Sequence, residues 1–431
     1  MTASNESRIS SLARAHRSWD LTIFRQTPIA AAVAASLWLK PGMPVQAAEA
    51  AAATSVLEEV TVTATRRSES VQDIPVNITA IGNSTIEDLR LDSIEKLTRL
   101  VPGVAMIDQG AWNDNRLVMR GLSASSITNT FGATTGGVGQ FNGATVATYL
   151  GETPLYVSFK LLDIDRVEAL IGPQGTLYGA GTLAGAVRYI PKRPDLNEVE
   201  GETQVRVYSV SHADSEGYQG DAALNLPLVD GKLALRGVIG YYSDPGFIDY
   251  PLLLRTPGSS DPEPDLNDPD AVAANLHRGK DLNDEQTFTS RLSLLYRPFD
   301  SLDALLTWAH QRTDTGGRSI STAPLFGLGR YEIGMRVPEP GHNSADLWSL
   351  ELSAELGFAQ LVSSSSYTRR ELAFTRDQTD LLLDFEYGYE TFPSFVTVAP
   401  TQVSRDQYTQ ELRLVSSGDG PFKWLAGGFY N

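Results

Sequence analysis

The amino-acid sequence predicts an N-terminal α+β domain followed by a series of antiparallel transmembrane β-strands. Three observations lead to this fold class. The chain begins with a secretory pattern, a glycine-rich run lies within a mixed α+β region, and regular alternation of apolar and polar residues follows from Gly201 onward. No apolar run reaches the roughly 18 residues that a transmembrane helix needs, so any membrane crossing would be made by strands.

The first 47 residues have the layout of a bacterial secretory signal. Arginines between Arg8 and Arg25 precede an apolar stretch, Pro28 to Leu39, and a small-residue cleavage pattern ends at Ala47. We predict that residues 1–47 are a signal peptide and that the mature protein is exported. A short buried helix is the alternative.

Composition excludes several classes of function. The 431-residue chain contains no cysteine and carries a formal net charge of −17. The first fact excludes disulfides and cysteine-based metal or redox chemistry, and the second argues against nucleic acid as a partner. The histidines are scattered without ligand spacing, so we predict no metal site.

The sequence contains no recognisable catalytic motif. Gly179 and Gly181 form a Gly-x-Gly, but a third glycine at the dinucleotide-binding spacing is missing, and no Gly-Lys-Ser/Thr follows. A Gly-x-Ser-x-Gly nucleophile turn is missing as well. We therefore predict no catalytic residue, no cofactor and no enzymatic activity.

Residues 48–65 read as a spacer that ends in an extended segment. Small residues fill the spacer up to Ser55, and Val60 and Val62 then alternate with threonines. Such a β-prone segment, about residues 57–65, can add as a strand to the sheet edge of another protein. The first strand of the following domain is the alternative interpretation.

Residues 66–197 read as a compact α+β domain. We expect Ser84 to cap a helix, with Glu87 three residues further on. The other expected elements are a second helix from Ser93 and strands around residues 76–81, 115–121 and 145–150. Residues 122–143 are rich in Ser, Thr and Gly and read as a loop.

The glycine-rich run lies between Arg166 and Pro194. Its glycines stand among β-branched and aromatic residues, a spacing that predicts short strands joined by turns with positive φ or close backbone approach. These glycines are Gly172, Gly175, Gly179, Gly181 and Gly185.

From Gly201 to Asn431 the sequence alternates in segments of about ten residues. In one segment Leu235 and Ile239 share a face, whereas Arg236 and Gly240 share the other. Apolar outer and polar inner faces are typical of strands that cross an outer membrane, and the lengths fit the roughly 9–11 residues needed. We count about nine such strands; a soluble β-sandwich is the alternative.

Short and long connections alternate between these segments, as periplasmic turns and outer loops do. Tight turns are expected near Asp230, Asp300, Gly357 and Gly418, and long connections at about 243–285, 313–345 and 371–402. Aromatic residues near segment ends read as an interfacial girdle: Tyr241, Tyr242, Trp308, Tyr367 and Tyr408.

Two loops carry concentrated charge. The acidic loop 259–270 could bind Ca²⁺, but a solvated acidic loop is the favoured interpretation. The second long loop and its flanks contain four arginines that could attract an anion or serve lipid phosphates and solubility: Arg312, Arg318, Arg330 and Arg336.

The amino-acid sequence of residues 57–197 resembles that of the plug domain of TonB-dependent outer-membrane receptors. The Gly-Pro-Gln-Gly-Thr-Leu-Tyr-Gly stretch from Gly172 and the later Lys-Arg-Pro are the most specific part. The resemblance implies a plug over residues 66–197, followed by part of a barrel (residues 201–431) that has about 22 strands in this class. The implied plug motif residues are Arg120, Gly121, Arg166, Glu168, Gly172, Pro173, Gly175, Tyr178, Gly179, Gly185, Lys192 and Arg193.

The extended segment similarly resembles the TonB box of these receptors. The resemblance implies that TonB binds the residues Glu58, Glu59, Val60, Thr61, Val62, Thr63 and Ala64. It also implies an outer-membrane location in contact with lipid and lipopolysaccharide, and energised import of a scarce ligand, by default a ferric siderophore. Sugars, cobalamin or aromatic compounds are alternative cargoes. A passive porin-like channel and a soluble periplasmic β-protein are alternative classes.

With about nine of some 22 strands, the resemblance further implies that the chain is a fragment and would not close a barrel alone.

Overall fold

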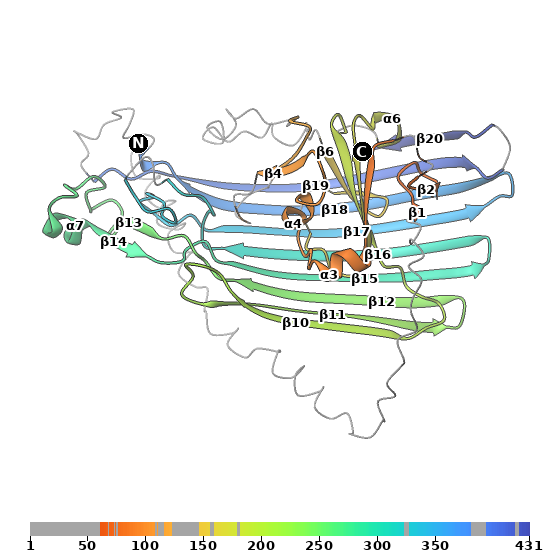
Figure 1. Ribbon diagram of the computed structural model, residues 1–431, viewed down its shortest axis with the longest axis horizontal. Helices are drawn as coiled ribbons and strands as arrows, with labels where there is room; N and C mark the ends of the chain where they lie inside the picture. The colour runs from red at the N-terminus through yellow and green to blue at the C-terminus, as the bar shows by residue number, and fades with distance from the viewer. Residues whose placement is uncertain are drawn as a thin grey trace, which may run out of the picture. The chain divides into compact units, whose positions relative to one another are not determined.

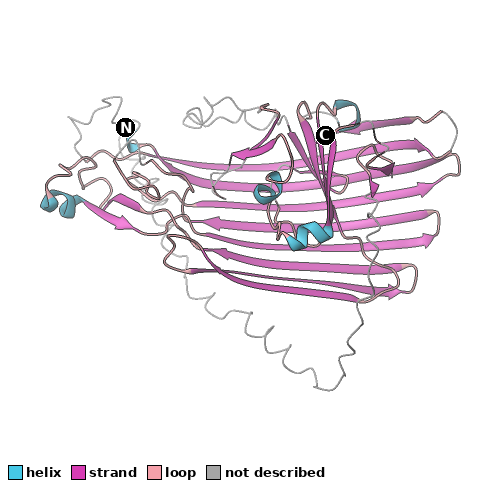
Figure 2. Cartoon of the chain, in the orientation of Figure 1, coloured by secondary structure: helices cyan, strands magenta, loops and turns pink. Residues whose placement is uncertain are grey.

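The computed structural model describes residues 61–431, with gaps at 68, 73, 75, 108–109, 111–115, 123–145, 156–158, 179–181, 323–326, 381–393 and 419–421. Residues Glu59–Asn431 form one compact unit. The predicted signal peptide, most of the spacer and nearly all of the loop expected at 122–143 lie outside the described residues. Strands dominate the described chain, and its helices are short (Figure 2).

One nine-stranded sheet, which we call the wall, accounts for most of the C-terminal part. Every strand pairs antiparallel with the next in the order, which confirms the prediction of about nine antiparallel strands. In order they are β10 (Glu200–Ser209), β11 (Glu216–Val229), β12 (Leu233–Asp244), β15 (Glu285–Phe299), β16 (Leu302–Thr315), β17 (Gly341–Glu355), β18 (Ala359–Asp377), β19 (Val398–Ser416) and β20 (Leu425–Tyr430).

Alternation along each strand gives the wall two different faces. On β12, Arg236 is 5% exposed and Ile239 is 57% exposed. On β19, Arg413 is 7% exposed and its neighbour Leu412 is 50% exposed. The inner face is therefore polar and covered, and the outer face is apolar, as in a wall with lipid outside.

The strands are longer than the sequence pattern indicated. β18 and β19 contain 19 residues each. Near the start of β19 the polar residues Gln402 and Ser404 occupy the outer face, so the alternation identifies only the part that faces lipid. The backbone ladder continues beyond it, and Tyr367 and Tyr408 consequently lie inside strands, not near their ends.

The prediction for Tyr242 is wrong. Its side chain is 1% exposed and packs with Leu162 of the preceding domain, on the inner face of the wall. Tyr241, which alternates with it, points outward.

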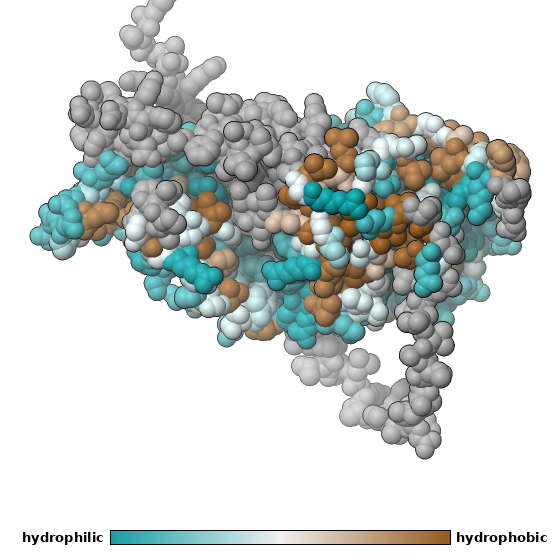
Figure 3. Space-filling model, turned by 45° about the horizontal axis from the view of Figure 1, so that its top comes forward, coloured by the Kyte–Doolittle hydropathy of each residue, from teal (hydrophilic) through white to brown (hydrophobic). Residues whose placement is uncertain are grey.

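Short and long connections alternate, as predicted (Figure 1). Tight turns join β11 to β12, β15 to β16 and β17 to β18 at one end. The long connections at the other end contain β13 (Tyr250–Leu254), α7 (Pro269–Asn275) and β14 (Leu276–Gly279). They enclose a small core of their own around Ile248, Leu253 and Ile333. On the face drawn in Figure 3, the end that carries α7 is mostly hydrophilic.

The N-terminal domain, which we call the plug, is built on a mixed five-stranded sheet in the order β3–β8–β9–β6–β7. β6 and β9 run parallel, and the other pairs are antiparallel. The strands are β3 (Ile78–Gly82), β6 (Val146–Leu150), β7 (Thr153–Leu155), β8 (Ile164–Ile171) and β9 (Gly185–Pro191).

Smaller elements surround the plug sheet. The hairpin of β4 (Val104–Ile107) and β5 (Arg116–Met119) and the helices α3 (Asn83–Asp88), α4 (Ile94–Thr98) and α6 (Gly175–Tyr178) complete the plug. Its largest apolar cluster extends into the wall and includes Ala309, Ala345 and Leu347. The plug is therefore packed against the inner face of the wall.

The predicted cap at Ser84 is wrong. The N-cap of α3 is Gly82, and Ser84 lies within the helix. Gly82 is also the last residue of β3, so the strand passes directly into the helix and no residue is left between them for a serine cap. Ser93 does occupy the N-cap position of α4, although its side chain makes no capping hydrogen bond.

Candidate functional site

The glycine-rich run forms strands and turns, as its spacing predicted. Gly172 has φ +117° and Gly185 has φ +156°, both in the region that favours glycine. A Cβ at Gly185 would lie 2.2 Å from the Leu170 carbonyl oxygen and 2.4 Å from the Met119 sulfur. Gly185 thus permits close approach of β9 to β8.

The described part of the box segment forms a hairpin at the edge of the plug. β1 (Thr61–Val62) pairs antiparallel with β2 (Glu69–Ser70). Arg66 closes the turn, with φ +65° and a 3.0 Å hydrogen bond from its N–H to the Thr63 carbonyl. Val62 is 0% exposed and Ala64 is 1% exposed. In this arrangement the segment is packed, not extended into solvent.

Plug motif residues hold this hairpin in place. The Thr63 N–H donates to Glu168 Oε1 at 2.9 Å, and Arg188 Nη1 donates to Thr63 Oγ1 at 2.9 Å. The Tyr178 hydroxyl donates to the Ala64 carbonyl at 2.6 Å. Arg188 also pairs with Glu168 at 2.6 Å, and both side chains are fully buried.

Glu152, in the turn between β6 and β7, connects the hairpin, the plug sheet and the wall. Arg66 contacts its Oε2, and Arg188 Nη2 lies 2.9 Å from its Oε1. Arg413 on β19 donates to Oε2 at 2.8 Å. Arg66 additionally reaches Glu411 of the wall at 3.2 Å. These five residues form one ion-pair network, which we call the coupling cluster.

Electrostatics keep the cluster charged. Burial alone would raise the pKa of Glu152, but Arg66, Arg188 and Arg413 outweigh it and hold that pKa well below its usual range. Burial raises the pKa of Tyr178, so its hydroxyl remains a donor. The Arg66 guanidinium lies 4.3 Å from the centre of the Tyr178 ring, a cation–π contact.

Arg67 continues the contact with the wall. Its Nη1 donates to the Ser416 carbonyl at 2.7 Å, and its Nη2 donates to Ser416 Oγ at 2.9 Å and to the Trp424 carbonyl at 2.8 Å. Ser416 ends β19, and Trp424 precedes β20. The tip of the hairpin is thereby bound to the connection between the last two wall strands.

The plug meets the wall at a second place, which we call the seat. Asp163 accepts two hydrogen bonds from Arg236, at 2.6 and 2.8 Å, and a third from Arg291 at 3.0 Å. Its side chain is 3% exposed. Nearby, Lys160 pairs with Glu285 at 2.9 Å. These buried pairs fix the segment before β8 against β12 and β15.

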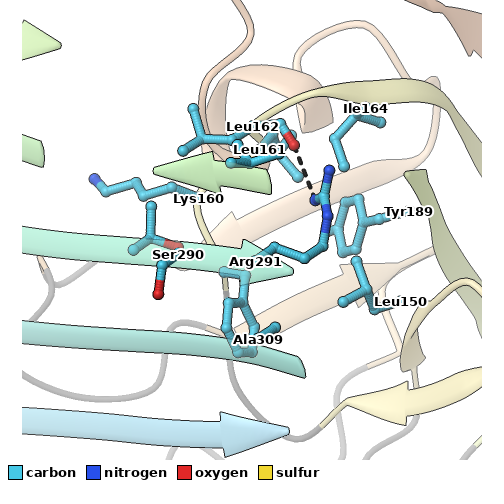
Figure 4. A pocket seen from close by; sticks show the side chains of 12 residues that line it. Leu150, Lys160, Leu161, Leu162, Ile164, Tyr189, Ser290, Arg291 and Ala309 are labelled. Carbon is cyan, nitrogen blue, oxygen red and sulfur yellow. Dashed lines mark hydrogen bonds between the residues drawn. The ribbon is translucent and has the colours of Figure 1, made fainter. Parts of the chain in front are cut away.

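An apolar contact and two small cavities complete the seat. Leu162 packs with Val238 and Tyr242 of the wall, and a Cβ at Gly240 would lie 2.5 Å from Leu162 Cδ1. Figure 4 shows Arg291 reaching across to the Leu162 carbonyl, which it contacts at 3.0 Å.

The cavity drawn in Figure 4 measures about 20 Å³, enough for about one water molecule. A second cavity of about 70 Å³ borders the same segment. Gln219 and Tyr242 line this second cavity, and each contributes a buried polar atom that has no partner among the described residues.

The contacts of the other predicted motif residues indicate mainly structural roles. Arg120 (φ +50°) and Gly121 (φ +77°) form the turn after β5. Lys192 lies 3.5 Å from Glu87 and 3.7 Å from Glu202, whereas Arg193 contacts Glu351 of the wall.

In the glycine-rich run itself, Arg166 Nε pairs with Glu168 at 2.9 Å. Pro173 is exposed, Gly175 begins α6, and Gly179 lies outside the described residues. Glu58, Glu59 and Val60 lie outside them as well. The structure therefore brings Thr63, Ala64, Arg166, Glu168 and Tyr178 together, since Arg166 Nη2 also donates to Thr63 Oγ1 at 3.3 Å, and it leaves the remaining motif residues apart.

Sequence reasoning did not identify Glu152, Arg413 or Asp163. Each acts through partners that are distant in the chain, so local spacing carries no signal for their roles. The one available sign was that Arg413 lies on the polar face of an alternating strand, where a charge needs a partner once it is covered.

The two charged loops have structural explanations. Asp261, Asp265 and Asp268 each accept a backbone N–H two residues ahead, and Asp268 also caps α7. Among the described residues, no group of histidines and carboxylates has metal-binding geometry.

The possible anion-attracting arginine patch is contradicted for two of its four members. Arg318 and Arg336 are each 6% exposed, and Arg318 is bound by Glu339 at 2.6 and 2.9 Å. Burial against the other loops has turned these side chains away from the solvent.

Within the described ranges, every helix is too short or too polar to traverse a bilayer.

A small mixed domain seated on the inner face of long antiparallel strands defines a class: outer-membrane β-barrel receptors with an N-terminal plug. Comparison with known proteins agrees. Residues 70–186 match the family model described as the TonB-dependent receptor plug domain, so the plug of this chain is similar to the plug domains of that family.

Among curated proteins, the ferric-pyoverdine 358 receptor of Pseudomonas putida is 28% identical over 179 residues, which are 41% of this chain and 19% of that receptor. The pesticin receptor of Yersinia pestis is 28% identical over 191 residues, which are 42% of this chain and 25% of that receptor. The crystal structure of the ferric yersiniabactin uptake receptor of Yersinia pestis shares the fold, with a TM-score of 0.60 and 18% identity. That match covers 82% of this chain and 48% of the receptor, so the chain spans less than half of that receptor's length.

Proposed function

We propose that the protein imports a scarce ligand across the outer membrane by coupling a pull on its box segment to rearrangement of the plug. The partner that pulls is TonB with its inner-membrane energising complex. TonB would bind Glu58–Ala64 by strand addition, in which backbone hydrogen bonds give affinity and alternate side chains give register.

One observation carries this proposal: the box segment is bonded to Arg188 of the coupling cluster, and the same cluster contains residues of the wall. Thr63 is bonded to Glu168 and Arg188, and Arg188 is bonded to Glu152. Glu152 in turn contacts Arg413 of the wall. Removing Thr63 from its site would therefore leave buried charges short of partners next to the plug–wall contact, which favours rearrangement there.

A ferric siderophore is the proposed cargo. Similar proteins are named for ferric pyoverdine and for the ferric yersiniabactin uptake system. Hemin and vitamin B12 are alternative cargoes, because a hemin receptor of Yersinia enterocolitica (26% identical) and a vitamin B12 transporter of Vibrio vulnificus (27% identical) are also similar to this chain. A passive channel is the less favoured class, since it has no need for a plug tied to its N-terminal segment.

The test uses cells that express the protein and radiolabelled ferric siderophores, hemin or cobalamin. Val62→Pro removes the N–H that strand addition needs, so we expect uptake to be abolished and ligand binding at the cell surface to be unchanged. Val62→Ala is the matched control, because it removes buried side-chain volume but keeps the backbone donor. Equal uptake by wild type and Val62→Pro would refute the box assignment.

A further inference from the structure

We propose that Arg67 places a barrier at the wall, met after the contacts of the box segment with the plug, which a pull must break before the plug rearranges. This inference takes its biological meaning from the proposed function. The contacts of Arg67 on which it depends are the same whichever partner pulls.

The first step is the direction of the Arg67 contacts. All three of its hydrogen bonds go to the connection between β19 and β20, and their lengths lie between 2.7 and 2.9 Å. Ser416 and Trp424 are themselves joined by two hydrogen bonds of 3.0 Å. Arg67 therefore binds a preformed turn, and it does so with a charged donor, which strengthens each bond.

The second step is the order of contacts along the chain. Thr61 and Val62 pair with Ser70 and Glu69, and Thr63 and Ala64 are bonded to the plug. Arg66 then contacts both the plug and the wall. Arg67 comes next, and its three hydrogen bonds go to the wall. A pull from the N-terminal side meets these contacts in that order.

A pull on the box segment loads the β1–β2 pairs and the Arg67 bonds differently. β1 and β2 are antiparallel, so a pull on β1 separates them one pair at a time, starting with Thr61 and Ser70. The three bonds of Arg67 leave one guanidinium and must yield together. Release of the box segment is thus separated from rearrangement of the plug by a distinct barrier at Arg67.

The experiment is single-molecule pulling on the full chain in outer-membrane nanodiscs. The protein has no native cysteine, so Glu59→Cys provides one attachment point. We expect a first event at low force as the box segment unzips, then a second, stronger event after roughly 20–25 Å of extension, at about 3.5 Å per released residue. Arg67→Ala should reduce the force of the second event about twofold and leave the first unchanged, because three charge-assisted bonds are lost.

Two variants control the result. Arg67→Lys keeps the charge with a smaller set of donors and should restore part of the second force. Arg193→Ala removes another contact between a plug arginine and the wall, with Glu351, away from the hairpin, and should leave both events unchanged. The proposal is overturned if Arg67→Ala gives the wild-type trace, or if Arg193→Ala lowers the second force equally.

Failure of this inference is distinguishable from failure of the proposed function. The covalent handle replaces TonB, so the pulling result stands whether or not TonB binds. TonB binding to wild type and Val62→Pro is measured separately, and only that measurement bears on the box assignment.

Discussion

The coupling cluster and the seat both join the plug to the wall through buried ion pairs, yet only the coupling cluster is bonded to the box segment. In the cluster, one plug carboxylate, Glu152, is shared by arginines from the hairpin, the plug sheet and the wall. In the seat, Asp163 forms ion pairs with two wall arginines beside an apolar contact made by Leu162. The difference indicates that the seat positions the plug, whereas the cluster makes its position depend on the N-terminal segment.

The largest effect is expected at the seat. Asp163→Ala leaves Arg236 and Arg291 buried with too few acceptors, which should lower the free energy of plug unfolding by about 3–5 kcal/mol. Urea denaturation followed by limited proteolysis of the plug measures this. Asp163→Asn, which keeps the shape and an acceptor, should lose less. If Asp163→Ala is as stable as wild type, the seat does not hold the plug.

Acid should act on the cluster. The pKa of Glu152 in the folded protein lies below its unfolded value, which is about 4.3. Its carboxylate therefore stabilises the plug fully above that pH and progressively less as pH falls below it, by up to about 1.4 kcal/mol per pH unit. Urea midpoints between neutral pH and pH 3 check this, with Glu152→Gln as the control. An equal acid response in both proteins would contradict the assignment.

The smallest effect concerns the apolar part of the seat. Gly240→Ala would place a Cβ 2.5 Å from the end of the Leu162 side chain. Because that end can shift, the cost in unfolding free energy should be about 1 kcal/mol. A double-mutant cycle with Leu162→Ala should show coupling, since the shorter side chain makes room for the new methyl group. Strict additivity would mean that the two residues do not press on each other.

Sequence patterns predicted the wall well because its strands follow one simple rule. Lipid on one side and a covered polar surface on the other make every second residue apolar, as in residues 233–242. The alternation is required only where a strand contacts lipid, so it could not give the full length of β18 or β19. The prediction of a cap at Ser84 was wrong for a different reason. Gly82 is both the last residue of β3 and the N-cap of α3, and local capping preferences do not take account of a strand that passes directly into a helix.

The candidate site was only partly predictable. Local sequence motifs placed Glu168 and Tyr178 in the plug, whereas the box segment, predicted to lie in a linker before the plug, is packed with it as a hairpin. The motifs could not place Glu152 at the centre of the cluster, because that role requires residues 66, 188 and 413 to meet in space. Spacing in sequence says nothing about such a meeting, and the glutamate stands in an ordinary turn between two short strands.

The length of the wall strands has a consequence for the position of the long connections. At about 3.3 Å per residue, the 19 residues of β18 extend roughly 60 Å. Even when inclined by about 45°, they rise some 40 Å or more, against a hydrocarbon layer of about 30 Å. The strands are therefore longer than the hydrocarbon layer requires, so the small core around Ile248 and Ile333, at the end with the long connections, is expected to lie outside that layer.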